Sequence, residues 1–136
     1  MANYSHISCI PSNNITVFSF ELHSPITNAS DYELAVSYFN ARLNKQTRAC
    51  LISIKCDQLK PIPVGGKYEK WLKLIVSPKN SNFLTYESEH LDFISLGSYP
   101  ELNLLSIKIE VIGGGDSIFQ TGENIDMIII SRKKRV

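Results

Sequence analysis

The sequence predicts an all-β domain of about eight antiparallel strands, in a closed or two-sheet architecture. Two observations support this fold class. Apolar and polar residues alternate in several short segments, which is the period of a strand with one buried face. Residues that favour turns, mainly Gly, Pro and Asn, lie between these segments. Short strands that are regularly separated by turns are typical of sandwiches and barrels.

The first two clear strands are expected at residues 15–22 and 49–56. In the first, one face carries Thr16, Phe18, Phe20 and Leu22. In the second, one face carries Cys50, Ile52, Ile54 and Cys56. Each segment therefore has one face suited to a core.

The segment between them, residues 30–43, fits two structures equally well. Ser30 and Glu33 have the spacing of a capping box, and apolar residues follow at helical spacing: Ala35, Val36, Phe39 and Leu43. An alternating set in the same segment fits one face of a strand: Tyr32, Leu34, Val36 and Tyr38. The residues alone do not decide between helix and strand.

Five further strands are expected in the second half of the chain. Residues 70–76 set Leu72, Leu74 and Val76 on one face. Residues 104–112 alternate most clearly, with an inward set of Leu105, Ile107, Ile109 and Val111. The remaining expected strands are 83–88, 91–96 and 124–131.

The glycine-rich stretch GGGDS at 113–117 could be a phosphate loop or a turn. It has neither the lysine of a Walker loop nor a helix after it, and another strand is expected soon after Gly122. Glycine also tolerates the positive φ angles of turns. The stretch is interpreted as a long connection between two strands.

No constellation of residues indicates catalysis, a metal site or a cofactor. His6, His23 and His90 lack the spacing of metal ligands. Glu87, Glu89 and Asp92 near His90 could bind a cation, but a polar connection between strands explains them equally well. A catalytic dyad of a cysteine with His90 has no support from neighbouring residues. Cys9, Cys50 and Cys56 are an odd number without CxxC spacing, so we expect unbridged structural thiols. We therefore expect a protein that is not an enzyme.

The 136 residues fit one domain, 1–136, with a short flexible N-terminus at 1–13 and a basic C-terminal tail at 132–136. No apolar run approaches the roughly 20 residues of a membrane span, and the first residues do not resemble a secretory signal. Of the 14 basic residues, four lie at 132–135, so residues 1–131 carry 10 basic against 13 acidic residues. Attraction to polyanions would have to come from the tail.

Two groups are candidate interaction residues. Trp71, with Tyr68 before it, could stack on a sugar or base, or could be a half-buried aromatic of a sheet. The tail residues Arg132, Lys133, Lys134 and Arg135 could bind a polyanion, serve as a nuclear import signal or end the last strand in water. We expect that replacing all four with alanine leaves the fold and the thermal midpoint nearly unchanged.

Two stretches resemble single jelly-roll penton and minor capsid proteins of Polinton-like, adintovirus-like and virophage-type DNA viruses. In VFSFELHSPITNASDYELAVSYFN (17–40), the matching residues are Phe18, Phe20, Leu22, Pro25, Tyr32, Glu33, Leu34 and Ala35. The second stretch, LLSIKIEVIGGGDSIFQTGENIDMIIISRK (104–133), is similar to the closing hairpin of those proteins.

This resemblance implies a jelly roll in which residues 32–38 are a strand. It also implies a viral structural protein that self-associates in an icosahedral shell with other capsid proteins. Such a protein is expected in the virion, and in the host cytoplasm or nucleus during assembly. Nucleic acid or an acidic partner could meet the basic tail. The alternative function is a lectin-like, ligand-binding β-sandwich that uses Trp71 and the acidic group near His90.

Overall fold

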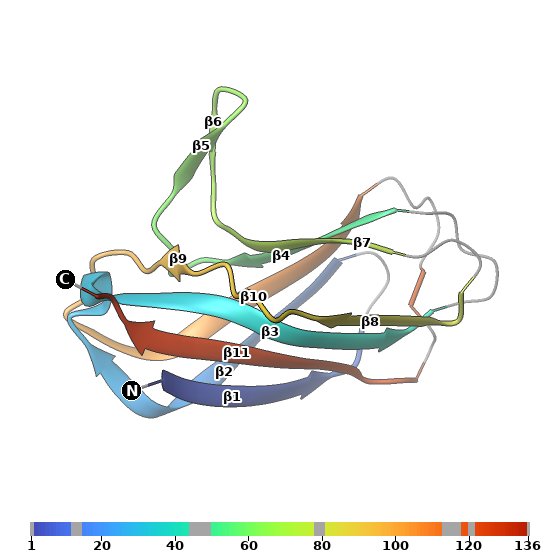
Figure 1. The fold of residues 1–136 in the computed structure, drawn as a ribbon, viewed down its shortest axis with the longest axis horizontal. Helices are drawn as coiled ribbons and strands as arrows, with labels where there is room; N and C mark the ends of the chain where they lie inside the picture. Colours follow the sequence, from blue (N-terminus) through green and yellow to red (C-terminus); the bar gives the residue numbers. More distant parts are fainter. Residues whose placement is uncertain are drawn as a thin grey trace.

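A computed structural model describes residues 2–11, 15–43, 50–77, 81–112, 118–119 and 122–135. Eight long strands make up most of this fold (Figure 1): β1 (Ala2–Cys9), β2 (Ile15–Thr27), β3 (Tyr32–Arg42), β4 (Leu51–Cys56), β7 (Trp71–Val76), β8 (Phe83–Glu87), β10 (Glu101–Ile112) and β11 (Ile125–Lys133). The shorter elements are the 3-10 turn η1 (Ala29–Asp31) and the strands β5 (Ile62–Val64), β6 (Lys67–Glu69) and β9 (Ile94–Ser95).

The long strands form two antiparallel sheets with a jelly-roll order. One sheet has the order β1-β11-β3-β8, with β9 also pairing with β3, and the other has the order β2-β10-β4-β7. Along the chain, the first long strand pairs with the last, the second with the seventh, the third with the sixth and the fourth with the fifth. This is a strand ribbon wrapped into two sheets, the double-sheet jelly roll. The expected all-β, jelly-roll-like sandwich of about eight strands is confirmed.

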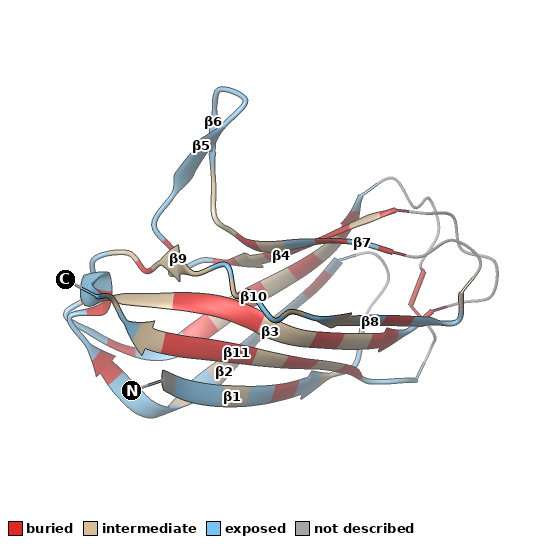
Figure 2. Cartoon of the chain, in the orientation of Figure 1, coloured by how far each residue is buried: buried red, intermediate tan, exposed pale blue. Residues whose placement is uncertain are grey.

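The core lies between the two sheets. Strand β10 buries Leu105, Ile107, Ile109 and Val111, as its alternation predicted. Facing them from the other sheet, β3 and β11 bury Phe39 and Ile129. Figure 2 shows this alternation as red bands along the strands of both sheets. Burial of these inner faces is the main driving force for the fold.

The ambiguous segment is a strand, as the resemblance implied. Strand β3 pairs with β11 on one side and with β8 and β9 on the other. Its register against β11 shifts between the partners Val36 and Tyr38, and Ser37 lies in this bulge. The bulge moves the buried face from Val36 to Phe39, three residues later. A spacing of three residues between apolar side chains is also typical of a helix, which is why the sequence fitted both structures.

A second bulge changes the face of β7. Trp71 pairs with Lys55 and Lys73 pairs with Ile54, which leaves Leu72 in the bulge. Leu72 and Ile75 are buried, whereas Leu74 and Val76 are exposed. The expected common face of Leu72, Leu74 and Val76 is therefore wrong, because the extra residue inverts the alternation after Leu72.

Both chain ends are more ordered than the sequence indicated. Residues 2–9 of the expected flexible N-terminus form β1, whose Ile7 is buried beside the apolar β11. Strand β11 continues through Arg132 to Lys133, so the first two residues of the expected tail belong to the sheet. Strand β1 is largely polar, so alternation alone does not reveal it. Pairing with the hydrophobic strand β11 stabilises it.

Two of the expected features lie between the long strands: the strand at residues 91–96 and the GGGDS connection at 113–117. Strand character within 91–96 is limited to Ile94–Ser95. The GGGDS stretch lies outside the described residues, but β10 and β11 belong to different sheets and do not pair. Strands β10 and β11 therefore do not form a hairpin with each other, and the resemblance of residues 104–133 to the viral proteins stays a prediction.

The cysteines are free, and Cys50 and Cys56 are buried on the inner face of β4, as expected. Burial raises the pKa of Cys56 from 9.0 to about 11. Burial, with a smaller effect of the Asp126 carboxylate, also raises the pKa of Cys9 from 9.0 to about 11. Thiols with raised pKa values are poor nucleophiles because the thiolate is the reactive form.

We expect iodoacetamide at pH 8 to alkylate Cys9 and Cys56 at least about 100-fold more slowly in the folded protein than in urea. The direction follows from the higher folded-state pKa, which keeps both thiols protonated at this pH. Mass spectrometry of timed samples measures the two rates. Rapid alkylation of Cys56 in the folded protein would contradict the assignment of this residue as a structural thiol.

Candidate functional site

A β-hairpin stands away from the sandwich between β4 and β7 (Figure 1). Its strands β5 and β6 pair from Ile62↔Glu69 to Val64↔Lys67. The turn residues Gly65 and Gly66 have φ angles of 57° and 80°. A two-residue turn with both φ angles positive requires glycine-like residues and matches the twist of a hairpin. Residues 62–69 are called the hairpin arm below.

A groove of about 310 Å³ lies between the hairpin arm and the edge strand β7. It is lined mainly by Ile62, Val64, Trp71, Lys73, Leu74 and Asp92. The apolar residues come from both the arm and β7, and Asp92 comes from the segment before β9. The groove is therefore an apolar channel with charged residues on one wall.

Trp71, which lines the groove, also carries an unpaired hydrogen-bond donor. Its indole Nε1 is buried and has no hydrogen-bond partner among the described residues. A buried donor without a partner costs about 1–3 kcal/mol, so such a group in a native fold requires an explanation.

The charged wall is built by Lys73 and Asp92. Lys73 Nζ donates a hydrogen bond of 2.8 Å to Asp92 Oδ2 and lies 4.9 Å from the ring centroid of Tyr86 in β8. The hydrogen bond to Asp92 raises the pKa of Lys73, and the same bond lowers the pKa of Asp92. Lys73 thus stays charged and links the edges of the two sheets.

The structure brings together Trp71 and one member of the acidic group near His90, as the lectin-like alternative expected. Trp71 and Asp92 line the same groove. Glu87, Glu89 and His90 are exposed near it, and the described residues contain no cluster of three or more His, Cys, Asp or Glu side chains that could bind a metal ion. Sequence reasoning missed Lys73 and the hairpin arm. The Gly65-Gly66 pair between two short β-prone segments was the available signal for the arm.

A second candidate surface covers the outer face of the β2-β10-β4-β7 sheet. Six exposed apolar side chains lie there and are called the outer patch: Ile15, Val17, Leu74, Val76, Leu104 and Ile112. Val76 and Ile112 lie in one row across the sheet, on either side of Leu51. The row of Val76, Leu51 and Ile112 is contiguous apolar surface, which marks interaction sites more often than isolated exposed residues do.

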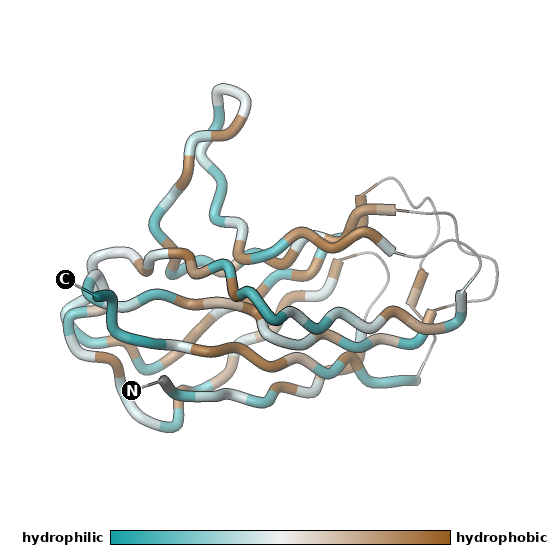
Figure 3. Tube along the Cα trace, viewed as in Figure 1, coloured by the Kyte–Doolittle hydropathy of each residue, from teal (hydrophilic) through white to brown (hydrophobic). Residues whose placement is uncertain are grey.

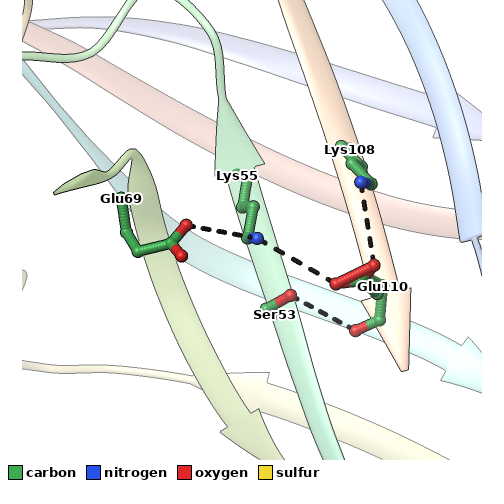
Figure 4. A network of polar contacts seen from close by, with 5 residues as sticks. All are labelled: Ser53, Lys55, Glu69, Lys108 and Glu110. Carbon is green, nitrogen blue, oxygen red and sulfur yellow. Dashed lines mark hydrogen bonds and ion pairs between the residues drawn. The ribbon is translucent and has the colours of Figure 1, made fainter. Parts of the chain in front are cut away.

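A network of charges crosses the same face (Figure 4). Lys55 Nζ lies 3.4 Å from Glu69 Oε2 and 4.0 Å from Glu110 Oε1. Lys108 Nζ lies 3.7 Å from the other carboxylate oxygen of Glu110. Two lysines and two glutamates balance one another, so this face has no net charge from the network.

The basic tail divides into bound and exposed residues. Arg132 Nε donates a 2.8 Å hydrogen bond to Glu33 Oε1, and the guanidinium lies 3.5 Å from the ring centroid of Phe93. Lys134 Nζ donates to the carbonyl of Ser30 at 2.8 Å. Lys133 and Arg135 are exposed. The four residues therefore do not form one solvated cluster.

Replacing Arg132 with alanine is expected to lower the free energy of unfolding by about 1–3 kcal/mol, because Glu33 loses a charge-assisted hydrogen bond in a partly buried position. Lys133→Ala is the matched control and should change it by less than about 0.5 kcal/mol. Urea unfolding measures both. The expectation that all four residues can be replaced without a stability change is thus corrected for Arg132, and equal midpoints for the two variants would contradict this correction.

Comparison of the chain with models of protein families finds no matching family, and searches among curated proteins and solved structures find no match. The described residues contain no helix of the length and hydrophobicity needed to cross a membrane.

Proposed function

We propose that the protein is a non-enzymatic viral structural protein, a penton-type or minor capsid jelly roll that self-associates in an icosahedral shell. The observation that carries this proposal is the strand order of the two sheets. The double-sheet jelly roll is an architecture of viral capsid proteins, lectins and cupins. Because a fold alone does not determine a function, the surface features must decide among these classes.

The outer patch supports self-association. Its exposed side chains include Val17 at 67% and Val76 at 69% relative exposure, on a face with a balanced charge network. Apolar area of this kind is stabilised when a neighbouring subunit covers it, by about 25 cal/mol for each Å² removed from water. Specific interfaces bury about 1,200–2,000 Å² in total. Repeated copies of one rigid sandwich would supply such contacts without any covalent chemistry.

Exposed basic residues give the subunit a possible second contact. Lys133 and Arg135 are exposed near the end of β11. In a shell they would meet packaged nucleic acid or an acidic patch on another capsid protein. A contact with phosphates would weaken with the logarithm of salt concentration, with a slope of about −0.7 to −0.9 for each phosphate neutralised.

A lectin-like, ligand-binding function is the second candidate, and the groove favours it. Trp71 and Asp92 line one cavity, and aromatic faces with nearby carboxylates suit sugar rings and their hydroxyls. This function requires a monomer or small oligomer whose groove stays open.

Size-exclusion chromatography with light scattering distinguishes the two candidates. The purified protein at increasing concentration should form a discrete oligomer such as a trimer or ring, and its Trp71 emission should not respond to a panel of soluble glycans. A protein that stays monomeric at all concentrations, with an emission change on addition of glycans, would favour the lectin-like function instead.

A further inference from the structure

The hairpin arm is a surface feature that the fold does not explain by itself. All residues from 61 to 68 are exposed, and Figure 2 shows the arm in the colour of exposed residues along most of its length. A lone two-stranded hairpin is at best marginally stable in water. This arm nevertheless carries large exposed apolar side chains, Ile62, Val64 and Tyr68, and hydrophobic positions along it are brown in Figure 3. Such an arm requires a partner that covers it.

The register of the arm separates its two faces. Ile62 pairs with Glu69 and Val64 with Lys67, so these four side chains share one face, which is the face toward the groove. Pro63 pairs with Tyr68 on the opposite face. The arm and β7 therefore form a hook whose inner side combines the apolar Ile62 and Val64 with the charged Lys67 and Glu69.

A hook of this shape is complementary to a second copy of itself. Its inner side combines an apolar strand pair, from Ile62 and Val64, with an apolar groove at Trp71 and Leu74. Two hooks related by a twofold axis can interlock, so that each arm fills the groove of the other copy. Both subunits then contribute the same residues, the arm and the groove, to the interface, as in the twofold-symmetric dimers that are the commonest oligomers.

Charge complementarity favours the same occupant. Lys67 lies near the tip of the arm on its inner face and forms no ion pair within the described part of the chain. The wall of the groove carries Asp92, whose side chain is 68% exposed despite its bond to Lys73. An inserted arm would bring the free ammonium group of one copy toward this carboxylate of the other.

We infer that two copies of the chain exchange their hairpin arms, each arm occupying the groove beside β7 of the other copy. This inference rests on the proposed self-association and specifies one contact through which it occurs. The contact buries Ile62 and Val64 of each arm against Trp71 and Leu74 of the other copy. The other members of the outer patch remain available for contacts with further subunits.

The fluorescence of the only tryptophan in the chain tests the inference directly. Because Trp71 lines the groove, its emission should shift to shorter wavelengths as the protein concentration rises and pairs form. The double variant Ile62→Ser, Val64→Ser should move the midpoint of this shift to at least about 100-fold higher concentration, a change of about 2.7 kcal/mol in pairing free energy. Tyr68→Ser, on the opposite face of the arm, is the matched control and should leave the midpoint unchanged.

Zero-length carbodiimide cross-linking of a mixture of ¹⁴N- and ¹⁵N-labelled protein identifies the contacting residues. Arm exchange predicts cross-linked peptides of mixed labelling that join Lys67 to Asp92 or Glu69. If mixed-label peptides join other sites, or if the Ile62/Val64 variant associates as the wild type does, arm exchange is wrong while self-association in a shell remains. A wild-type protein that stays monomeric, including one whose Trp71 emission responds only to glycans, would overturn both.

Discussion

Phe39→Ala is expected to lower the free energy of unfolding by about 3–5 kcal/mol, the largest stability change that we predict for one substitution. The Phe39 side chain is fully buried in β3, where it packs in the core between the sheets. Its loss removes apolar burial and leaves a cavity that the flanking strands cannot close, because β3 is paired on both sides. Since domains have a total stability of about 5–15 kcal/mol, the variant would be close to unfolding.

Urea unfolding followed by circular dichroism measures this change. Tyr4→Ala on the edge strand β1 is the control, because Tyr4 is 70% exposed and should contribute less than about 0.5 kcal/mol. A midpoint for Phe39→Ala within error of this control would mean that β3 does not occupy the centre of its sheet.

The second large effect is expected on assembly. Replacing both Val76 and Ile112 with glutamate introduces two negative charges into one row of the outer patch. Covering this row would then bury two charges without partners, which costs several kcal/mol. We expect assemblies larger than a dimer to become at least about 100-fold less favourable.

The fold should tolerate these two changes, since both side chains are already exposed, and Val76 is 69% exposed. Light scattering at matched concentrations measures the assemblies, and thermal unfolding verifies the fold. Tyr4→Ser, which alters an exposed residue of the other sheet, is the control for assembly. Larger assemblies that persist in the folded double variant at wild-type concentrations would show that the outer patch is not an interface.

Sequence periodicity predicted the fold well wherever a strand lies in regular register. Strands β4 and β10 bury the residues that alternation selected, including Ile52, Ile54, Ile107 and Ile109. Alternation failed where a bulge interrupts the ladder. At Ser37 and at Leu72 one extra residue moves the buried side chains to the other face, and this shift depends on the partner strand. No local pattern contains that information.

The candidate site was less predictable than the fold. The sequence combines Trp71 with the whole acidic group near His90, but only the jelly-roll connections show that Asp92 is the member that lines the groove, together with Lys73. Strand β1 was also missed, because its polar residues are stabilised by pairing with the distant strand β11. The sequence places Arg132 in a basic tail that could bind a polyanion, serve as an import signal or end the strand in water, whereas Glu33 and Phe93 hold it at the end of β11. In each case the decisive partner is remote in the sequence.

Electron microscopy of the concentrated, purified protein tests the central claim, self-association into a shell subunit, most directly. We predict class averages of a closed assembly with rotational symmetry, in which sandwiches of this fold contact one another through the outer patch and the hairpin arms. Fields that contain only single 15.3 kDa molecules at every concentration would contradict the proposed structural role.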